Sequence, residues 1–414
     1  MFLILFLRFM IKINSLITIP LEGNGLITNS YYGNFSIGEP PQYQSLLIDT
    51  ASLFTFTSCE NICINCGKHN FKNYNMKKSI THKILNCNNS INKNKLCQFH
   101  ILFADNSIVE GILIKDIFTF KNIKLELIFG CLIKETNKIY NQPENGLFGL
   151  SNYYKENESK NFLFEKYNIK AFEYYFGENG GFLNLYNSNE SYSYLENNTI
   201  IINFRKHYKI EINDILIDNI SIFSNNKKYF AILDTGSTIN TIPEKLYNNL
   251  IQIFLNYKNN SNFLKYFKIR NDNELEFCYY RNNKIEVKNL YKSLPNINFI
   301  FEKNQTYILK PRYYLFNISD DELGDKNSIM CIGFEKTINN EIILGNTFMM
   351  QNKFFFNLNE QILIISKNQK CTFKLYYLFY LKNKIFYVII IIFCIFQFYY
   401  YFPFLYLVFT KKNK

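Results

Sequence analysis

Two copies of one short motif, almost half a chain apart, constrain the fold more than any other feature of this 414-residue sequence. LLIDTASLFTF starts at Leu46 and AILDTGSTINTI starts at Ala231, and in both an apolar run leads into Asp, Thr, a small residue and Ser. Each copy is followed later by a similar glycine-containing stretch, GLFGLS from Gly146 and IILGNTF from Ile342. A pattern that recurs in this way indicates one lobe written twice.

The rest of the chain has the pattern of a mainly β protein. Short runs that alternate apolar and polar residues recur between Gly, Pro and Asn, and they predict strands. Few segments have helical features, and many short strands favour sandwich-like or barrel-like packing over a doubly wound α/β domain. The predicted strands are Tyr43–Leu47, Ile108–Ile114, Tyr208–Ile217 and Gln361–Ile365, and the predicted helices are Glu158–Tyr167 and Pro243 to about Leu255.

The repeated motif points to acid–base chemistry at Asp49 and Asp234. Each aspartate follows apolar strand residues, so we expect it on a turn at a strand end in a mostly dry setting. Two such turns face to face would bring the carboxylates within hydrogen-bond range, where they would share one proton. One carboxylate can then take a proton from a water while the other donates one to a peptide carbonyl oxygen. A single copy would be read as a turn with a capping Asp, but two copies argue against that reading.

The residues that follow the aspartates have expected supporting roles. Thr50 and Thr235 can form hydrogen bonds across to the opposite lobe and fix the geometry. The hydroxyls of Ser52 and Ser237 can donate to the outer carboxylate oxygens.

Composition excludes several classes of protein. Hydrophobic residues make up 48% of the chain and charged residues 19%, which excludes a disordered or collagen-like chain. The net charge of +12 would ordinarily suggest nucleic acid as a partner. However, the basic residues are mostly lysines scattered along the chain, so we expect no nucleic-acid partner. The sequence has no phosphate-binding or dinucleotide fingerprint, and we expect no cofactor.

The two ends of the chain carry targeting features. Residues 1–20 hold a short apolar run interrupted by Arg8 and Lys12, which we interpret as a signal or anchor segment. A buried first strand and an incomplete gene start are the alternatives. Residues 385–409 contain no charge and are long enough to cross a bilayer as a transmembrane helix. The Lys-rich tail, residues 410–414, is then expected in the cytosol, where KKNK matches a K-K-x-x retrieval signal.

These motifs resemble those of the pepsin-type (A1) aspartic proteases over about Tyr31 to Cys371. YYGNFSIGEPPQ, from Tyr31, resembles the family's opening strand and turn, and YKIEINDILIDN, from Tyr208, its second hairpin. The resemblance implies a mainly β, bilobal acid protease fold that acts on polypeptides as a monomer. Its lobes would be residues 21–195, with a Cys-rich insert, and residues 196–375. It implies Asp49 and Asp234 as the catalytic pair, supported by Thr50, Ser52, Thr235, Gly236 and Ser237.

Within this family, two features resemble the plasmepsin branch that works in the endoplasmic reticulum. These are the cysteine cluster CENICINCGKHNFKNYN, Cys59–Asn75, and the C-terminal apolar segment. The resemblance implies a single-pass membrane enzyme with a lumenal body that cuts secretory or export cargo after the leucine of R-x-L. It makes LFADNS, with Phe103, the flap, and it makes Asp105 and Gln142 the residues that bind the substrate arginine. For Asp105, a plain turn residue at a hairpin tip is an equally weighted alternative.

Three residues depart from the family pattern. Ala51 stands where the family has Gly, Phe103 where the flap has Tyr, and Ala104 where the plasmepsin branch has a flap cysteine. These departures leave a non-catalytic, membrane-anchored peptide receptor as an alternative to an enzyme. A third option is a protease that cuts at apolar sites and does not recognise an arginine in its substrate.

The cysteines are interpreted as disulfide partners, because the chain also carries secretory features. Outside Cys394 in the apolar segment there are nine, so at least one stays unpaired. Zinc binding by the C-x3-C-x2-C cluster with His69, His82 and His100 is the less favoured alternative, and no metal is expected. By resemblance, Cys278 and Cys331 form the family's late disulfide. The candidates are Cys59, Cys63, Cys66, Cys87, Cys97, Cys131, Cys278, Cys331 and Cys371.

Overall fold

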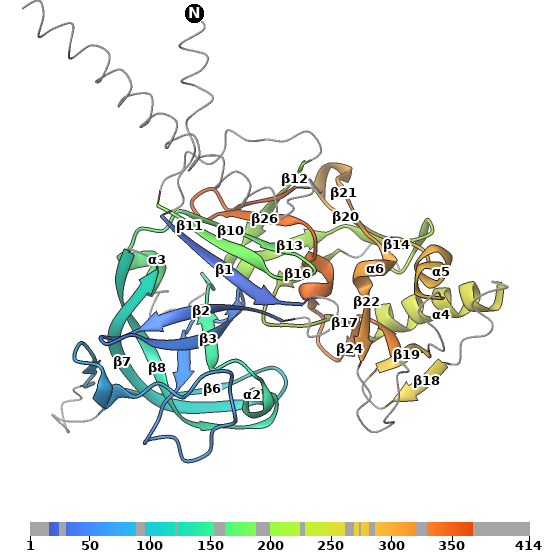
Figure 1. Ribbon diagram of the computed structural model, residues 1–414. Helices are drawn as coiled ribbons and strands as arrows, with labels where there is room; N and C mark the ends of the chain where they lie inside the picture. Colours follow the sequence, from blue (N-terminus) through green and yellow to red (C-terminus); the bar gives the residue numbers. More distant parts are fainter. Residues whose placement is uncertain are drawn as a thin grey trace, which may run out of the picture. The chain divides into compact units, whose positions relative to one another are not determined.

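The computed structural model describes most of the chain between residues 16 and 366 (Figure 1). The described ranges are 16–24, 30–87, 96–120, 123–152, 162–187, 199–223, 228–260, 269–272, 275–280, 286–318 and 329–366. The predicted transmembrane helix at 385–409, the tail at 410–414, Cys371 and Cys394 lie outside these ranges. Within them, no helix is both long and apolar enough to span a membrane.

The first half of the chain is built from antiparallel hairpins. β2 pairs with β3 from Tyr32 opposite Leu47 to Ile37 opposite Gln42. The two longest strands, β7 and β8, form a hairpin in which alternate residues of β7 are buried. The strands of this half are β1 (Ile17–Gly23), β2 (Tyr31–Ile37), β3 (Gln42–Asp49), β4 (Phe56–Ser58), β5 (Lys83–Ile84), β6 (Gln98–Leu102), β7 (Ile108–Phe120), β8 (Ile123–Glu135), β9 (Gly146–Gly149), β10 (Ala171–Phe176) and β11 (Gly181–Tyr186). Its helices are α2 (Asn137–Asn141), α3 (Phe162–Lys166) and the 3-10 turn η1 (Met76–Lys78).

The second half repeats this use of short strands and adds the longer helices. Two small sheets, β15-β14-β20-β21 and β18-β19-β23-β22, lie beside α4 and α5. Its strands are β12 (Thr199–Arg205), β13 (Lys209–Ile212), β14 (Asp214–Ile217), β15 (Ile220–Ser221), β16 (Tyr229–Leu233), β17 (Asn240–Pro243), β18 (Ile269–Asp272), β19 (Leu275–Tyr280), β20 (Ile297–Ile300), β21 (Thr306–Leu309), β22 (Leu315–Ile318), β23 (Ile329–Ile332), β24 (Phe334–Thr337), β25 (Ile342–Leu344), β26 (Lys353–Asn357) and β27 (Ile362–Ser366). Its helices are α4 (Glu244–Asn260), α5 (Glu286–Ser293), α6 (Pro311–Tyr314) and α7 (Asn346–Met349), with 3-10 turns η3 (Lys206–Tyr208) and η5 (Glu302–Asn304).

The sequence repeat corresponds to a repeated three-strand unit. In the first half, β9 runs parallel to β3 and antiparallel to β4. In the second half, β25 runs parallel to β16 and antiparallel to β17. In both, the strand that ends in the Asp motif and the strand that follows it are joined by the later glycine-containing stretch. The expectation that one lobe is written twice is therefore met at the level of strand pairing.

One sheet connects the two halves. Strand β10 pairs with β26, so β1, β11 and β10 from the first half continue into β26, β27 and β12 from the second. Aromatic side chains pack across this junction: the rings of Phe172 and Phe356 are 4.6 Å apart, and those of Tyr174 and Phe354 are 5.4 Å apart. Part of the high Phe and Tyr content therefore lies in the core that joins the halves.

The first strand begins inside the segment 1–20 that we interpret as a signal or anchor. Strand β1 begins at Ile17, inside the segment 1–20, and it pairs with both β2 and β11. Ile17, Ile19 and Leu21 are buried at alternate positions, as the period of a half-buried strand requires. Residues 17–20 are thus part of strand β1, and the rest of the segment up to residue 15 lies outside the described ranges.

Most predicted elements have counterparts in the structure. The four predicted strands fall in β3, β7, β13 with β14, and β27. The helix predicted from Pro243 is α4, which starts at Glu244 and extends to Asn260. Of the helix predicted at 158–167, the described part forms α3. Helix α5 was not predicted.

Candidate active site

Asp49 is the last residue of β3, and its carboxylate is surrounded by hydrogen-bond donors. Oδ1 accepts from the backbone N–H groups of Ala51 (2.7 Å) and Ser52 (3.0 Å). Oδ2 accepts from the hydroxyl of Ser52 (2.6 Å). The side chain is buried, because Asp49 is only 5% exposed. This set of donors stabilises the ionised form of a carboxyl that its burial would otherwise keep neutral.

Asp234 follows β16 in the same way, but fewer donors contact its carboxylate. Oδ1 accepts from the backbone N–H of Gly236 (2.9 Å). The hydroxyl of Ser237 donates to the carbonyl oxygen of Ile239 (3.0 Å), so the expectation that it donates to the carboxylate is wrong. The Ser237 side chain satisfies a carbonyl of its own turn instead. The two motifs are thus alike in sequence and unequal in hydrogen bonding.

The threonines of the two motifs lock the halves together. The hydroxyl of Thr50 donates to the carbonyl oxygen of Leu233 (2.7 Å) and accepts from the N–H of Thr235 (3.0 Å). The hydroxyl of Thr235 donates to the carbonyl oxygen of Ile48 (2.7 Å) and accepts from the N–H of Thr50 (3.0 Å). Both threonines are completely buried. This reciprocal set is the predicted cross-lobe contact, and it fixes one aspartate loop against the other.

Glycines in the later stretches allow each loop to close. Leu150 N–H donates to the carbonyl oxygen of Asp49 (2.8 Å), and Asp234 N–H donates to that of Leu344 (3.0 Å). A Cβ on Gly149 would lie 2.6 Å from the carbonyl oxygen of Phe54, and one on Gly345 would lie 2.3 Å from that of Ile239. Only glycine permits this approach of backbone to backbone. The second repeated stretch therefore supports the loop that carries the aspartate.

The two carboxyl groups are in direct contact. Asp49 and Asp234 share a side-chain hydrogen bond. Gly236 lies against the carboxyl group of Asp49, and a Cβ at position 236 would be 2.7 Å from both Cγ and Oδ2 of Asp49. The corresponding position in the first motif is Ala51, so a methyl group is accommodated on one side of the pair and excluded on the other.

The electrostatics of the pair favour one shared proton. Removal from bulk water raises the pKa of Asp49, although hydrogen bonds from Ser52 and Ala51 oppose this rise. Burial and the negative charge of Asp49 raise the pKa of Asp234 to about 8, against backbone hydrogen bonds from Gly236 and Ser237. Because Asp49 has more donors, the proton resides mainly on Asp234. The pair can therefore offer a base and an acid at the same time.

His207 is a contact of the active-site loop that the sequence reasoning missed. It lies in η3 with a φ of 63°, and its backbone N–H donates to Oδ1 of Asn152 (3.0 Å). Its Nε2 lies 3.0 Å from the carbonyl oxygen of Ala51, so this nitrogen donates. A positive charge on His207 lowers the pKa of Asp49. No sequence signal joins these residues, because Ala51 and His207 come from opposite halves of the chain.

The predicted flap is the turn between β6 and β7. Phe103 N–H donates to the carbonyl oxygen of Ser107 (2.9 Å), which closes the turn. Both carboxylate oxygens of Asp105 accept from Ser107, Oδ1 from its N–H (2.9 Å) and Oδ2 from its hydroxyl (3.0 Å). Asp105 thus serves as a turn residue, and it remains exposed at the tip. The Phe103 ring packs against Phe56, with ring centres 6.2 Å apart.

Gln142 lies directly after α2, a short helix that contacts the flap. The side-chain amide of Asn137, the first residue of α2, donates to the carbonyl oxygen of Asn106 at the flap tip (2.9 Å). Since a helix rises about 1.5 Å per residue, Gln142 lies within about 8 Å of that contact along the axis. The carbonyl oxygen of Gln142 accepts from Nδ1 of His69 (3.1 Å). The segments that carry Asp105 and Gln142 are therefore adjacent, although the structure records no contact between their side chains.

The described cysteines form disulfides. The pairs are Cys59–Cys131, Cys63–Cys66, Cys87–Cys97 and Cys278–Cys331. The pairing of the three cysteines in the C-x3-C-x2-C cluster leaves none of them as a thiolate for zinc. Across the part of the chain that the structure describes, no group of three or more His, Cys, Asp or Glu side chains is arranged to hold a metal ion.

Comparison with known proteins agrees with this site, in which two aspartates are in contact on loops that are hydrogen-bonded to each other. The profile of the eukaryotic aspartyl protease family matches residues 30–367. The chain belongs to this family. It is an aspartic endopeptidase of the pepsin type, with the mainly β fold expected of it.

Three relatives show how far the similarity extends. Plasmepsin V of Plasmodium falciparum is 25% identical, over 80% of this chain and 68% of the relative. Aspartic proteinase 36 of Arabidopsis thaliana is 22% identical, over 74% of this chain and 67% of the relative. Pregnancy-associated glycoprotein 2 of Bos taurus is 26% identical, over 82% of both chains.

Proposed function

We propose that this aspartic endopeptidase hydrolyses peptide bonds with Asp49 and Asp234 as its catalytic pair and a water as the nucleophile. The observation that carries this proposal is the contact between the two carboxyl groups, on loops locked by Thr50 and Thr235. Asp49, with three hydrogen-bond donors, is the ionised partner. Asp234, with its raised pKa, is the protonated partner.

The reaction then needs no cofactor. Asp49 accepts a proton from the water, and the water oxygen attacks the carbonyl carbon of the peptide. Asp234 donates its proton to the carbonyl oxygen, which gives a tetrahedral diol. As the C–N bond breaks, the proton held by Asp49 goes to the leaving nitrogen and a diol hydroxyl returns its proton to Asp234. The pair ends with the single proton it began with.

We further propose that the substrates are secretory or export proteins with an R-x-L type motif. The similarity to Plasmepsin V supports this proposal, together with the nearness of the flap tip to the segment of Gln142. The Asp105 carboxylate is exposed and keeps lone pairs beyond those used by Ser107. A carboxylate and an amide oxygen are suitable partners for the planar donors of a guanidinium group.

The proposed location is the membrane of the endoplasmic reticulum, with the catalytic body in the lumen. The charge-free segment at 385–409 and the terminal KKNK support this proposal. The four disulfides are consistent with an oxidising compartment. Microscopy of the tagged chain, with and without its last four residues, tests the location.

A peptide cleavage assay tests the substrate proposal. An R-x-L peptide should be cleaved after Leu, and replacement of Arg by Lys should lower kcat/KM about 10- to 100-fold, because a bidentate charged contact is lost. Asp105→Asn and Gln142→Ala should reduce this preference for Arg, whereas Asp214→Asn, a matched change on β14, should not. Equal rates on the Arg and Lys peptides would exclude an arginine site while leaving the peptidase assignment intact.

A further inference from the structure

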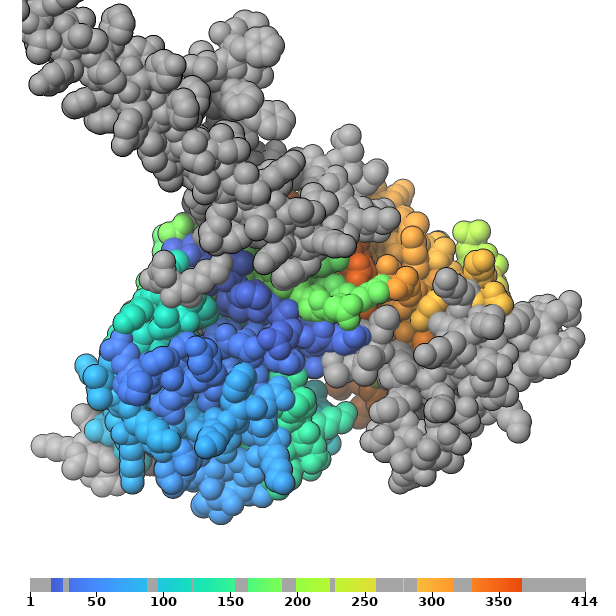
Figure 2. All heavy atoms as spheres, viewed as in Figure 1, coloured from blue at the N-terminus to red at the C-terminus, as the bar shows by residue number. Residues whose placement is uncertain are grey.

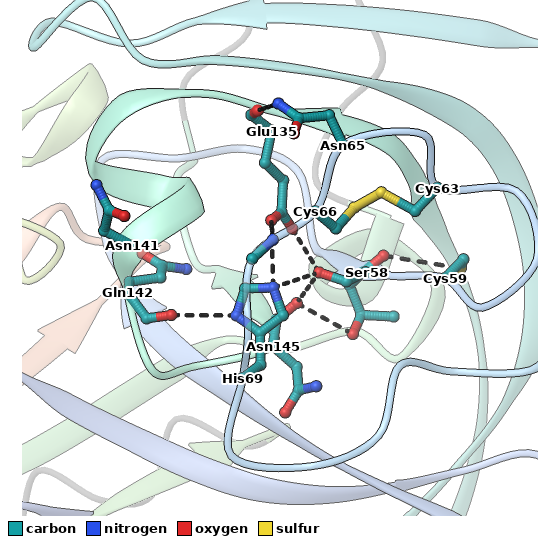
Figure 3. Close-up of polar contacts among 12 residues, drawn as sticks. Ser58, Cys59, Cys63, Asn65, Cys66, His69, Glu135, Asn141, Gln142 and Asn145 are labelled. Carbon is teal, nitrogen blue, oxygen red and sulfur yellow. Dashed lines mark hydrogen bonds and ion pairs between the residues drawn. A yellow bond between two sulfur atoms is a disulfide. The ribbon is translucent and has the colours of Figure 1, made fainter.

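A buried ion pair joins the Cys-rich insert to strand β8. The insert is the segment Cys59–Asn75, and its His69 side chain contacts Glu135 at the end of β8 (Figure 3). Nε2 of His69 lies 3.2 Å from Oε2 of Glu135, and the exposed fractions of the two side chains are 0% and 1%. The hydroxyl of Ser58 contacts both, at 3.1 Å from Nε2 and in a short hydrogen bond to Oε1. Buried charges persist only where they are paired in this way.

The acceptors on both sides of the His69 ring favour the imidazolium form, which carries both protons. Nδ1 faces the carbonyl oxygen of Gln142 (3.1 Å), which can only accept. Nε2 faces the Glu135 carboxylate, which also accepts the N–H of Gly67 (2.9 Å). Only a doubly protonated ring donates to both partners. Burial opposes the charge, but the hydrogen bond and negative charge of Glu135 outweigh it and raise the pKa of His69.

One further carboxyl acts on this ring. Glu144, in the connection before β9, is buried and accepts from the hydroxyl of Ser30 (3.1 Å). Burial raises the pKa of Glu144, and the charge of His69 opposes that rise. Glu135 on β8 thus contacts His69 directly, and Glu144 acts on the ring through its negative charge. Both favour the imidazolium form.

The ion pair fastens the segment that borders the flap. This segment, Thr136–Asn145, will be called the α2 segment. On the insert side, Gly67 packs so closely that a Cβ would lie 1.8 Å from the carbonyl oxygen of Tyr140, and Asn70 N–H donates to that of Pro143 (2.7 Å). Figure 3 shows the His69 ring between Glu135 and the Gln142 carbonyl, so that the ring bridges β8 and the α2 segment.

The other side of the α2 segment contacts the flap. Ile108 N–H donates to the hydroxyl of Thr136 (2.8 Å), and Asn137 donates to the carbonyl oxygen of Asn106 (2.9 Å). Ile139 belongs to the apolar cluster against which Phe103 and Cys66 pack. The α2 segment therefore contacts the insert on one side and the flap on the other. The insert and β6 lie at the surface of the molecule, in the blue to light-blue region of Figure 2.

We propose that His69 and Glu135 are a positioning pair for this peptidase: the imidazolium holds the α2 segment, and through it Gln142 and the flap tip, in the arrangement that binds substrate. The pair does not touch the reacting atoms. Loss of the His69 proton removes the donor to either Gln142 or Glu135 and leaves a buried carboxylate without its cation. The α2 segment then loosens and substrate binding weakens, while the aspartate pair stays intact. This inference rests on the proposed role of the flap side in substrate binding.

Steady-state kinetics of the full chain separate binding from chemistry. In His69→Gln the single side-chain amide can donate to only one of the two partners, the Gln142 carbonyl oxygen or the Glu135 carboxylate. KM should therefore rise about tenfold, as expected for the loss of one charged hydrogen bond, and kcat should change less than threefold. In wild type, KM should rise as the pH passes through the raised pKa of His69, and in His69→Gln it should not change there. Glu135→Gln removes the negative charge, so the rise in KM should shift to lower pH. His82→Gln, a matched change at a histidine bonded to the backbone carbonyl of Ser79, should leave KM as in wild type.

A fluorescent reporter tests the same inference without any substrate. The chain has no Trp, and Tyr140 on α2 is 38% exposed, so Tyr140→Trp places a single Trp on the α2 segment, whose emission can be excited selectively over that of the tyrosines. Its emission should shift to the red as His69 loses its proton, and His69→Gln should abolish that transition. A transition that persists in His69→Gln, or a KM that follows pH identically in both proteins, would overturn the inference. Failure to cut R-x-L peptides would instead concern only the proposed substrate, because the reporter needs no cleavage.

Discussion

The two small residues beside the aspartates are not equivalent. A Cβ at Gly236 would lie 2.7 Å from the Asp49 carboxyl, whereas Ala51 occupies the matching position of the first motif with the pair in contact. Gly236→Ala should therefore displace the carboxyl groups and lower kcat about 100-fold or more, the scale of a lost acid–base contribution. Ala51→Gly should keep kcat within about threefold of wild type, since no contact with the pair depends on the methyl group.

Both variants are measured by peptide cleavage, with circular dichroism to show that each is folded. Equal losses of kcat in the two variants would contradict the asymmetry between the motifs. A large gain of activity in Ala51→Gly would show instead that the alanine displaces the pair.

At the scale of single residues, the sequence predicted the groups that follow from the repeat and missed those that depend on distant contacts. Asp49, Asp234 and the threonine contacts follow from two copies of one motif. The direction of the Ser237 hydroxyl does not, because the carbonyl of Ile239 competes with the carboxylate for it. His69 was considered only as a zinc ligand, since its partner Glu135 is far away in the sequence.

At the scale of elements, the disulfides differ in the length of chain that they close. Cys59–Cys131 joins residues 72 positions apart, between the end of β4 and β8, whereas Cys63–Cys66 joins residues three apart within the insert. In the chain-entropy account, the long loop contributes about 4 kcal/mol to the free energy of unfolding and the short one about 2 kcal/mol. Replacing Cys59 and Cys131 by Ala should therefore lower the urea midpoint more than replacing Cys63 and Cys66 by Ala.

The urea transition of each double variant and of wild type, followed by circular dichroism, measures this difference. The Cys63 and Cys66 double variant is the control for the loss of a sulfur pair from the same insert. A larger loss of stability in that variant would contradict the expectation.

The same scale shows why elements are easier to predict than their partners. Alternation of apolar and polar residues in the sequence identified the strands that became β3, β7 and β27. It could not show that β10 would pair with β26 across the two halves, because any half-buried strand has that pattern. Residues 17–20 share the apolar character of the segment before them, and only the pairing of β1 with β2 and β11 shows that they belong to a strand. Helix α5 is short and mostly polar, so it gave little helical signal.

At the scale of the whole molecule, the active site exists only because the two halves meet. Each half contributes one aspartate, and the hydrogen bonds of Thr50 and Thr235 cross between the halves. The repeat in the sequence made this arrangement predictable. The insert and α2 segment belong to one half alone, so the repeat carries no information about them.

The measurement that tests the central claim most directly is the pH dependence of kcat/KM for peptide cleavage by wild type, Asp49→Asn and Asp234→Asn. The kcat/KM of the wild-type protein should rise as Asp49 ionises, at a pH above the ordinary range of an aspartate. It should fall again as Asp234 loses its proton, near the Asp234 pKa of about 8. Each Asn variant should remain folded and lose about 10²–10⁴-fold of the activity, while Asp214→Asn should follow wild type. A folded Asp49→Asn or Asp234→Asn protein that cleaves the peptide at close to the wild-type rate would contradict the claim that the two aspartates form the catalytic pair.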